Sequence, residues 1–401
     1  MTTQLSQRAL DIPPSPIRKL LPFELEARAR GIQVFKLNIG QPDVPTPRRF
    51  FEALNTDLPP VLGYGPSQGL PEFQQAVAQY YQRIGIPFEA GEIMATVGGS
   101  EALFFAFLAV ANPGDEIIVF EPFYTNYIGF AIYAGVKLVP FTTRAENGFH
   151  LPERDELEKL ITPRTRAILV CSPNNPTGTV LTRDELEMIG QLAVDRDLFV
   201  ISDEVYREFA YDGQLPPSMM AIEKAWDRII LCDSISKRFS ACGARIGNLA
   251  TKNAQVFLSV LRFGQARLCP ATAEQMGAIT LYTLGPDYYE QVRSEYMARR
   301  DAIFEGLMAI PQVVCQKPAG AFYIMAQLPI DDGDRFAQWL LTDFSSGGQT
   351  VMVAPGAGFY ATPGAGKHEI RLAYVLESAH CRRAMELLRE AVQVYPGSLL
   401  K

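Results

Sequence analysis

The sequence predicts an α/β protein with a largely parallel sheet that helices cover on both faces, followed by a smaller α+β unit. Short apolar runs rich in β-branched residues recur between residues 93 and 250, and helical patterns separate most of them. Continuous apolar strands that alternate with amphipathic helices are typical of parallel sheets buried on both sides. Beyond roughly residue 280 this alternation stops, which indicates a second unit.

The N-terminal segment lies outside the alternation. It contains a proline-broken arm at residues 13–16, a polar helical pattern around residues 23–30 and an extended run at residues 34–39. The stretch at residues 40–47 is rich in proline, which lacks a backbone donor and fixes φ, so we expect an irregular connection there.

Seven candidate strands make up the main sheet. They cover residues 93–97, 117–120, 137–140, 167–170, 198–201, 229–232 and 246–250. Between them, residues 102–111 predict a buried helix and residues 181–196 an amphipathic one. The later part of the chain predicts a long charged helix at residues 287–309, strands near residues 321–326, 350–353 and 370–374, and a final helix at residues 381–394.

Composition and charge argue against several classes of function. The 401 residues are 48% hydrophobic and 20% charged, and the formal net charge is −7. No basic run of five or more occurs, which argues against a nucleic-acid surface. The three histidines are not spaced as a pair of metal ligands, so we predict no metal site.

The expected compartment is the cytoplasm. Six cysteines are scattered without a CxxC pair, as expected for a reducing environment. The N-terminus lacks the apolar core of a signal peptide. The longest uninterrupted apolar run, residues 102–111, is too short to span a bilayer.

The most informative residues are a lysine and an aspartate that each follow a predicted buried strand. Lys237 comes shortly after the run at residues 229–232, and Asp203 comes shortly after the run at residues 198–201. An amine and a carboxylate are the pair that holds a pyridoxal ring. The amine joins the aldehyde as a Schiff base, and the carboxylate keeps the ring nitrogen protonated. Taken alone, each residue is weak evidence, since an isolated lysine after a strand is usually a solvated surface residue.

Four further residues could bind parts of a ligand: Ser100 and Arg245 a phosphate, Arg371 a carboxylate, and Asn175 any acceptor near the edge of the sheet. Ser100 opens the buried helix, where free N–H groups can bind phosphate, although a simple N-cap has the same pattern. Asn175 lies in a Pro/Asn/Gly turn after a strand. Arg245 could bind a phosphate through charge-assisted hydrogen bonds, or it could be a surface charge. Arg371, inside a predicted strand, suits bidentate capture of a carboxylate or a structural ion pair.

These residues belong to a series of motifs that resembles a known family. The order GGSEAL, EPFY, SPNNPTG, SDEVY, SISK, ARIG and RLAY is similar to class I aminotransferases of the fold-type-I pyridoxal phosphate superfamily. The similarity covers nearly the whole chain and is strongest to the bacterial aspartate aminotransferase-like branch. Jointly, SPNNPTG, SDEVY and SxSK at these separations are highly specific.

The resemblance implies both an architecture and an activity. The large domain (residues 46–285) would be a three-layer αβα unit with a seven-stranded, mostly parallel sheet. The small α+β domain would be built from both termini (residues 1–45 and 286–401). The implied activity is transfer of an α-amino group from an amino acid to a 2-oxo acid by a ping-pong pyridoxal/pyridoxamine phosphate mechanism, with aspartate and 2-oxoglutarate as one possible pair. The implied partner is a second copy of the chain, in a homodimer with shared active sites.

The resemblance also implies roles for individual residues. The catalytic residues would be Lys237, which forms the Schiff base, Asp203 and Tyr206. The other cofactor contacts would be Gly99, Ser100, Tyr124, Asn175, Ser234 and Arg245, together with Tyr64 of the partner subunit. The substrate would contact Gly40, Asn175 and Arg371, with Arg371 on the α-carboxylate.

The choice of amino acid stays open. In aspartate-specific relatives, a lysine that helps to bind the distal carboxylate often occupies the position of Ser100. Arg18, Arg262 or Arg267 could supply a substitute charge. Arg267 is the first candidate among them, although its sequence fits a solvent-facing or phosphate-contacting role equally well. A group of aromatic residues could instead favour an aromatic or aliphatic side chain; its members are Phe23, Tyr124, Tyr127 and Phe359.

Two other functional classes remain alternatives. One is a different pyridoxal phosphate-dependent reaction on the same fold, such as β-elimination, γ-elimination, decarboxylation or oxidation of an amino acid. The other is a non-catalytic regulator with an aminotransferase-like sensor domain. Such regulators usually carry an N-terminal DNA-binding segment, and we expect no room for one before Gly40.

Overall fold

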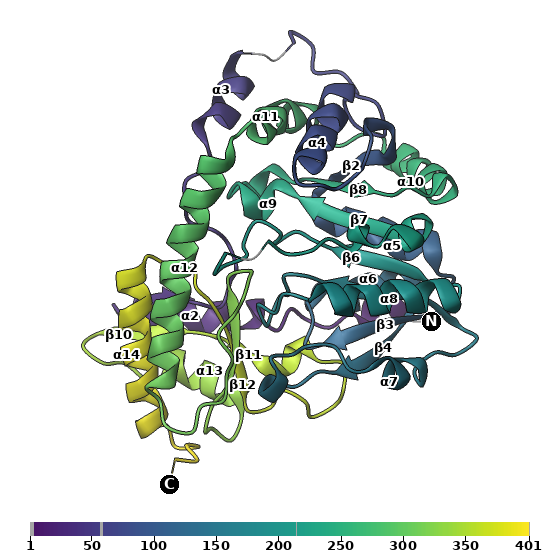
Figure 1. Cartoon of the computed structure of the whole chain (residues 1–401). Helices are drawn as coiled ribbons and strands as arrows, with labels where there is room; N and C mark the ends of the chain where they lie inside the picture. Colours follow the sequence, from purple (N-terminus) through teal and green to yellow (C-terminus); the bar gives the residue numbers. More distant parts are fainter. Residues whose placement is uncertain (1–3, 57–58, 214, 401) are drawn as a thin grey trace.

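A seven-stranded sheet forms the centre of the larger part of the molecule (Figure 1). The computed structural model describes residues 4–56, 59–213 and 215–400. All seven predicted strands are present, with ends within three residues of the expected ones. In spatial order they are β2 (Ile93–Val97), β8 (Ile246–Ala250), β7 (Ile229–Ser234), β6 (Phe199–Asp203), β5 (Thr165–Cys171), β3 (Glu116–Glu121) and β4 (Lys137–Thr142).

The sheet is mostly parallel, as predicted. β3 pairs in parallel with β4 and β5, β5 with β6, and β6 with β7. Only β8 runs antiparallel to its two neighbours, β2 and β7. The carboxyl ends of β2, β7, β6, β5 and β3 therefore lie at the same edge of the sheet.

Helices cover both faces of this sheet, which confirms the three-layer prediction. Side chains alternate along each strand: Ile118 and Phe120 of β3 face one apolar cluster, and Ile117 and Val119 face the other. The first cluster includes α4 (Pro71–Arg83) and α8 (Arg183–Asp195), and the second α5 (Gly98–Val110), α6 (Asn126–Ala134) and α10 (Ala254–Arg267). The predicted helix at residues 181–196 is α8, which begins after Thr182 because that residue forms a capping box with Glu185.

Segments from both ends of the chain build the smaller part. β1 (Gln33–Lys36) pairs in parallel with β10 (Gln349–Met352), and β12 (Glu369–Ala373) lies between β9 (Tyr323–Gln327) and the short β11 (Ala354–Pro355). Two predicted helices are present as α12 (Pro286–Met308) and α14 (Ser378–Val394), which pack together. The division at residues 45/46 and 285/286 stays a prediction.

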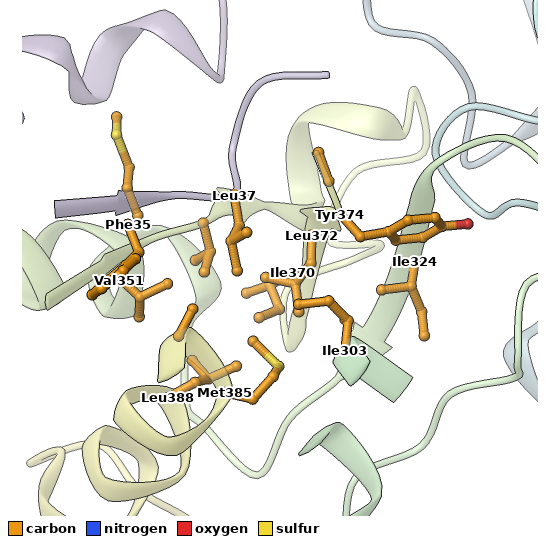
Figure 2. Close-up of a cluster of buried hydrophobic side chains, with 14 of the residues drawn as sticks. Phe35, Leu37, Ile303, Ile324, Val351, Ile370, Leu372, Tyr374, Met385 and Leu388 are labelled. Atoms are coloured by element: carbon orange, nitrogen blue, oxygen red, sulfur yellow. The ribbon is translucent and has the colours of Figure 1, made fainter. Parts of the chain in front are cut away.

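One large apolar cluster forms the core of this smaller part (Figure 2). Phe35 and Leu37 from the N-terminal segment pack with Val351, and Ile303 of α12 and Leu388 of α14 belong to the same cluster. The N-terminal segment is thereby fixed beside the C-terminal strands. The remaining α-helices are α1 (Gln7–Asp11), α2 (Leu21–Ala29), α3 (Arg48–Thr56), α7 (Arg154–Glu158), α9 (Ile235–Arg238), α11 (Thr272–Tyr282) and α13 (Gly333–Thr342). Within the described ranges, none of the helices has the length and hydropathy needed to cross a membrane.

Candidate active site

The predicted site residues meet at the carboxyl edge of the main sheet. Asp203 is the last residue of β6, Lys237 lies in the short helix α9 that directly follows β7, and Asn175 lies in the loop after β5. Because β5, β6 and β7 are parallel neighbours, these three loops lie side by side. Open α/β sheets bind their ligands at such an edge.

A cavity of about 540 Å³ opens at this edge. Eleven of the residues proposed from the sequence line it, and they come from both parts of the molecule. They are Gly40, Gly99, Ser100, Tyr124, Asn175, Asp203, Tyr206, Ser234, Lys237, Arg245 and Arg371. Tyr64 does not line it and is 84% exposed, so its contact with a neighbouring subunit's phosphate stays a prediction.

The Lys237 amine is held by the N-terminal segment. Its Nζ donates a 2.7 Å hydrogen bond to the carbonyl oxygen of Gly40 and lies 3.8 Å from Sγ of Cys242. Gly40 has no side chain, and a Cβ there would collide with the phenol of Tyr323. The glycine therefore allows the backbone of residue 40 to reach the lysine.

The Asp203 carboxyl is buried and forms a hydrogen bond with a buried tyrosine. The Tyr127 hydroxyl donates a 2.7 Å hydrogen bond to Oδ2 of Asp203. Burial raises the pKa of Asp203 to about 6, and the hydrogen bond from Tyr127 acts in the opposite direction. The carboxyl is therefore poised to become a stable anion when a cation arrives beside it.

Backbone and side-chain donors gather where α5 begins. Gly98 has φ +69 and opens α5 directly after β2. A Cβ on Gly247 of β8 would lie 2.6 Å from the carbonyl carbon of Gly98 and 2.7 Å from the nitrogen of Gly99. Ser234 and Arg245 line the same cavity. Free N–H groups at the start of a long helix, a hydroxyl and a guanidinium form a set of donors suited to a phosphate.

Arg371 is a buried cation without an acidic partner among the described residues. Its side chain donates to Asn175 Oδ1 at 3.0 Å and to the Asn38 carbonyl oxygen at 2.6 Å, while its Nε is unpaired. The guanidinium lies 4.5 Å from the Tyr323 ring centroid and 4.8 Å from that of Phe359. Burial lowers the pKa of Arg371 from its ordinary value. The alternative of a structural ion pair is therefore not observed, and a ligand carboxylate fits this position.

Three residues at the site were not assigned these positions from the sequence. Tyr323 shares a 2.8 Å hydrogen bond with Tyr206, Tyr127 contacts Asp203, and Cys242 contacts Lys237. Burial is the main reason that the pKa of Tyr206 lies well above its ordinary value, so its hydroxyl keeps its proton and can donate. The sequence signal for Tyr323 was weak: it lies in a predicted strand, but its face depends on the strand register, in which Arg371 pairs with Met325 and Tyr323, two residues away, shares that face.

The structure distinguishes among the three arginines that the sequence offered for binding a distal carboxylate. Arg267 donates from Nε to Glu101 at 3.1 Å and from its Nη atoms to the carbonyl oxygens of Ser67 and Ala95, and it does not line the cavity. Arg262 is exposed on α10, also outside the cavity lining. Arg18 lines the cavity. Arg267, the most tempting candidate in the sequence, is thus engaged elsewhere within the subunit.

Comparison with known proteins agrees with this geometry. Residues 32–388 match the family model of aminotransferase class I and II. An aspartate/prephenate aminotransferase of Thermus thermophilus is 33% identical, with 95% of this chain and 97% of that protein covered. An aromatic-amino-acid aminotransferase of Thermococcus litoralis is 34% identical, with 97% and 98% covered. The structure of an alanine aminotransferase from Pyrococcus furiosus superposes with a TM-score of 0.88 at 31% identity, covering 96% of this chain and 99% of that one. The chain belongs to the class I and II aminotransferase family.

Proposed function

We propose that the cavity binds pyridoxal 5'-phosphate and that the protein transfers the α-amino group of an amino acid to a 2-oxo acid. The observation that carries this proposal is that the Lys237 amine, the Asp203 carboxyl and the buried Arg371 guanidinium all line one cavity. An amine, an acid and a carboxylate-binding cation are the groups that amino transfer on a pyridine ring requires.

The residues present fit this cofactor. The start of α5, Ser234 and Arg245 offer donors to a phosphate, and Gly98 and Gly247 keep side chains away from that place. Asp203 offers a carboxylate to a ring nitrogen, and Tyr124 offers an aromatic face. The volume of about 540 Å³ lies within the roughly 300–1,000 Å³ usual for small-molecule sites.

Each residue would contribute a separate physical effect. The cofactor, when bound, supplies an aldehyde that joins amines and a protonated ring that withdraws electrons from the substrate α-carbon. Asp203 would hold the ring nitrogen in its protonated form, since a buried carboxylate gains most from an adjacent cation. Tyr206 and Asn175 would donate hydrogen bonds to the ring oxygen.

Lys237 would move the proton at the substrate α-carbon. Its amine is held by the Gly40 carbonyl oxygen and by no carboxylate among the described residues, so little opposes its movement toward a substrate. Arg371 would bind the substrate α-carboxylate, with Asn175 fixing the orientation of the guanidinium. This contact would orient the α-carbon toward the lysine.

We also propose a cytoplasmic homodimer with shared sites. Val61, Leu62 and Tyr64 are all exposed in the single chain, which supports a partner surface in that region. Tyr64 of the partner subunit would then contact the cofactor phosphate. The six cysteines are free, which supports a reducing compartment.

The test is a panel of amino donors and oxo-acid acceptors, followed by the absorbance of the cofactor. An aminotransferase should convert to its amino form with the donor alone and recover only when a 2-oxo acid is added. Recovery without an oxo acid, or release of carbon dioxide or ammonia, would instead favour elimination, decarboxylation or oxidation. A protein that neither binds pyridoxal phosphate nor changes with any donor would contradict the proposal.

A further inference from the structure

The side chains that line the cavity carry an excess of positive charge. Within the described part of the chain, four are basic and one is acidic: Arg18, Lys237, Arg245, Arg371 and Asp203. A cavity with this balance favours a ligand that brings several negative charges. The proposed function, on which the following argument rests, uses Lys237 for the proton, Arg245 for the phosphate and Arg371 for the α-carboxylate. Arg18 has no role in it.

In the described part of the chain, the guanidinium of Arg18 has no partner. Among the described residues, its guanidinium makes no ion pair and no hydrogen bond, and only backbone atoms of Arg18 are engaged: its nitrogen donates to Ser15 Oγ at 3.3 Å and its carbonyl oxygen accepts from the nitrogen of Leu21. The adjacent Lys19, by contrast, pairs with Asp334 at 2.5 Å. A guanidinium left exposed beside a cavity keeps all five donors available for a ligand.

The segment that carries Arg18 is docked at both sides of the site. Ile12 packs against Gly129 of α6, in the larger part of the molecule, and Pro16 packs against Gly358, next to Phe359. Ile17 joins the small apolar cluster that contains Phe359, whose ring lies over Arg371. Arg18 is therefore held near the substrate position by the packing of its neighbours, not by chance exposure of a free tail.

The other candidate cations do not reach the cavity within the subunit. Arg267 is bound to Glu101 and to three carbonyl oxygens, and Arg262 lies outside the lining. Ser100, which does line the cavity, carries no charge. Arg18 is the cation that remains for a second carboxylate.

We infer that Arg18 binds the side-chain carboxylate of a dicarboxylic amino acid or oxo acid, and so gives the enzyme its preference for acidic substrates. A guanidinium matches a carboxylate with two parallel hydrogen bonds, and substrate entry would remove water from both groups and strengthen the pair. A substrate with a neutral side chain would leave Arg18 without this contact.

The experiment compares Arg18→Leu and Arg18→Lys with Lys19→Leu, a control that removes a charge from the same segment but not from the cavity. The ratio of kcat/KM for aspartate and glutamate to kcat/KM for phenylalanine and leucine should fall about 10- to 100-fold in Arg18→Leu, mainly through KM, as expected for loss of a charged hydrogen bond. Arg18→Lys should restore part of the ratio, and Lys19→Leu should keep it. An unchanged ratio in Arg18→Leu, or a wild-type protein that rejects dicarboxylic substrates, would overturn the inference.

Binding of a non-reacting probe separates this inference from the proposed function. Calorimetry with succinate on the cofactor-loaded protein should show weaker binding in Arg18→Leu than in wild type, while butyrate should bind both equally. Equal loss of succinate and butyrate would refute the role of Arg18 even in an active aminotransferase. Arg18-dependent succinate binding in a protein that transaminates no donor would support Arg18 and refute the proposed function.

Discussion

The hydroxyl of Tyr127 donates a 2.7 Å hydrogen bond to Oδ2 of Asp203 at the carboxyl end of β6. This contact connects α6 to the sheet at the residue proposed to hold the cofactor ring. The carboxyl is buried, which raises its pKa to about 6, and Tyr127 partly offsets that effect by stabilising the anion. Without a cation beside it, Asp203 is therefore a costly group to keep ionised.

Replacing Asp203 with asparagine should change the pH dependence of folding stability. The folded pKa of about 6 lies above the ordinary value of 3.8, so the folded protein retains a proton that the unfolded chain has lost. Wild-type stability should therefore fall as the pH rises through this window, and Asp203→Asn should lack that fall. Between about pH 4.5 and about pH 7.5, the cofactor-free variant should gain about 2 kcal/mol relative to wild type.

Urea unfolding of both cofactor-free proteins at the two pH values measures this gain. Tyr127→Phe is the matched control with the opposite sign, since loss of the hydrogen bond raises the pKa of Asp203 further and should reduce stability at the higher pH. A stability difference between Asp203→Asn and wild type that does not depend on pH would contradict the assignment. Asp203→Asn should also lose most of its transaminase activity, because a substitution that relieves an unfavourable group at a functional site usually reduces function.

Lys237→Ala should abolish transamination and the visible absorbance of the lysine-bound cofactor. The amine is the group that would both hold the aldehyde and move the α-proton, so no other contact replaces it. Lys252→Ala is the control, because Lys252 pairs with Glu92 at 2.8 Å and lies outside the cavity. Turnover by Lys237→Ala at the wild-type rate would show that the proposed catalytic residue is wrong.

The main sheet could be predicted because most of its strands contain a short, largely apolar run and helical patterns separate most of these runs. The same pattern located Asn175, Asp203 and Lys237, since residues that follow parallel neighbours must meet at one edge. Tyr127 and Tyr323 were harder, because they enter from a helix and from a second sheet, and their direction depends on how these elements pack.

The roles of the arginines also could not be assigned from the sequence alone, because they depend on tertiary contacts. Nothing in the residues around Arg267 reveals that Glu101, far away in the chain, takes up its charge. Arg18 was one candidate of three until the packing of Pro16 and Ile17 fixed its segment beside the cavity. Residue type and spacing identify which groups could bind a charge, whereas only tertiary contacts decide which of them are already satisfied.

Arg371→Leu should weaken the binding of every substrate that carries an α-carboxylate. The substitution removes the buried guanidinium that Asn175 orients. The binding free energy, calculated from the change in kcat/KM, should weaken by about 2–5 kcal/mol, mostly through a higher KM. The cofactor-free fold should lose little stability, because Arg371 has no acidic partner whose charge would be left unpaired among the described residues. An unchanged KM for the amino donor would contradict the role of Arg371, and steady-state kinetics with thermal unfolding tests both parts.

Gly247→Ala should disrupt the proposed phosphate-binding position without changing any side chain proposed to bind the phosphate. The added Cβ would lie 2.6 Å from the Gly98 carbonyl carbon and 2.7 Å from the Asp233 carbonyl oxygen, so the strand β8 and the start of α5 must separate. Backbone atoms at such distances cannot rotate away as a flexible side chain would. The affinity for pyridoxal phosphate, measured by absorbance titration of the cofactor-free protein, should fall at least about tenfold.

Gly243→Ala is the matched control, because a Cβ at residue 243 meets no atom within 4 Å. Gly243 lies between Lys237 and Arg245, in the segment that leads into β8, so this variant reports any general effect of an alanine close to the site. Circular dichroism of both variants would show that the sheet is intact. If Gly247→Ala bound pyridoxal phosphate and inorganic phosphate as tightly as Gly243→Ala, the close approach of β8 to α5 would not be what shapes the anion site.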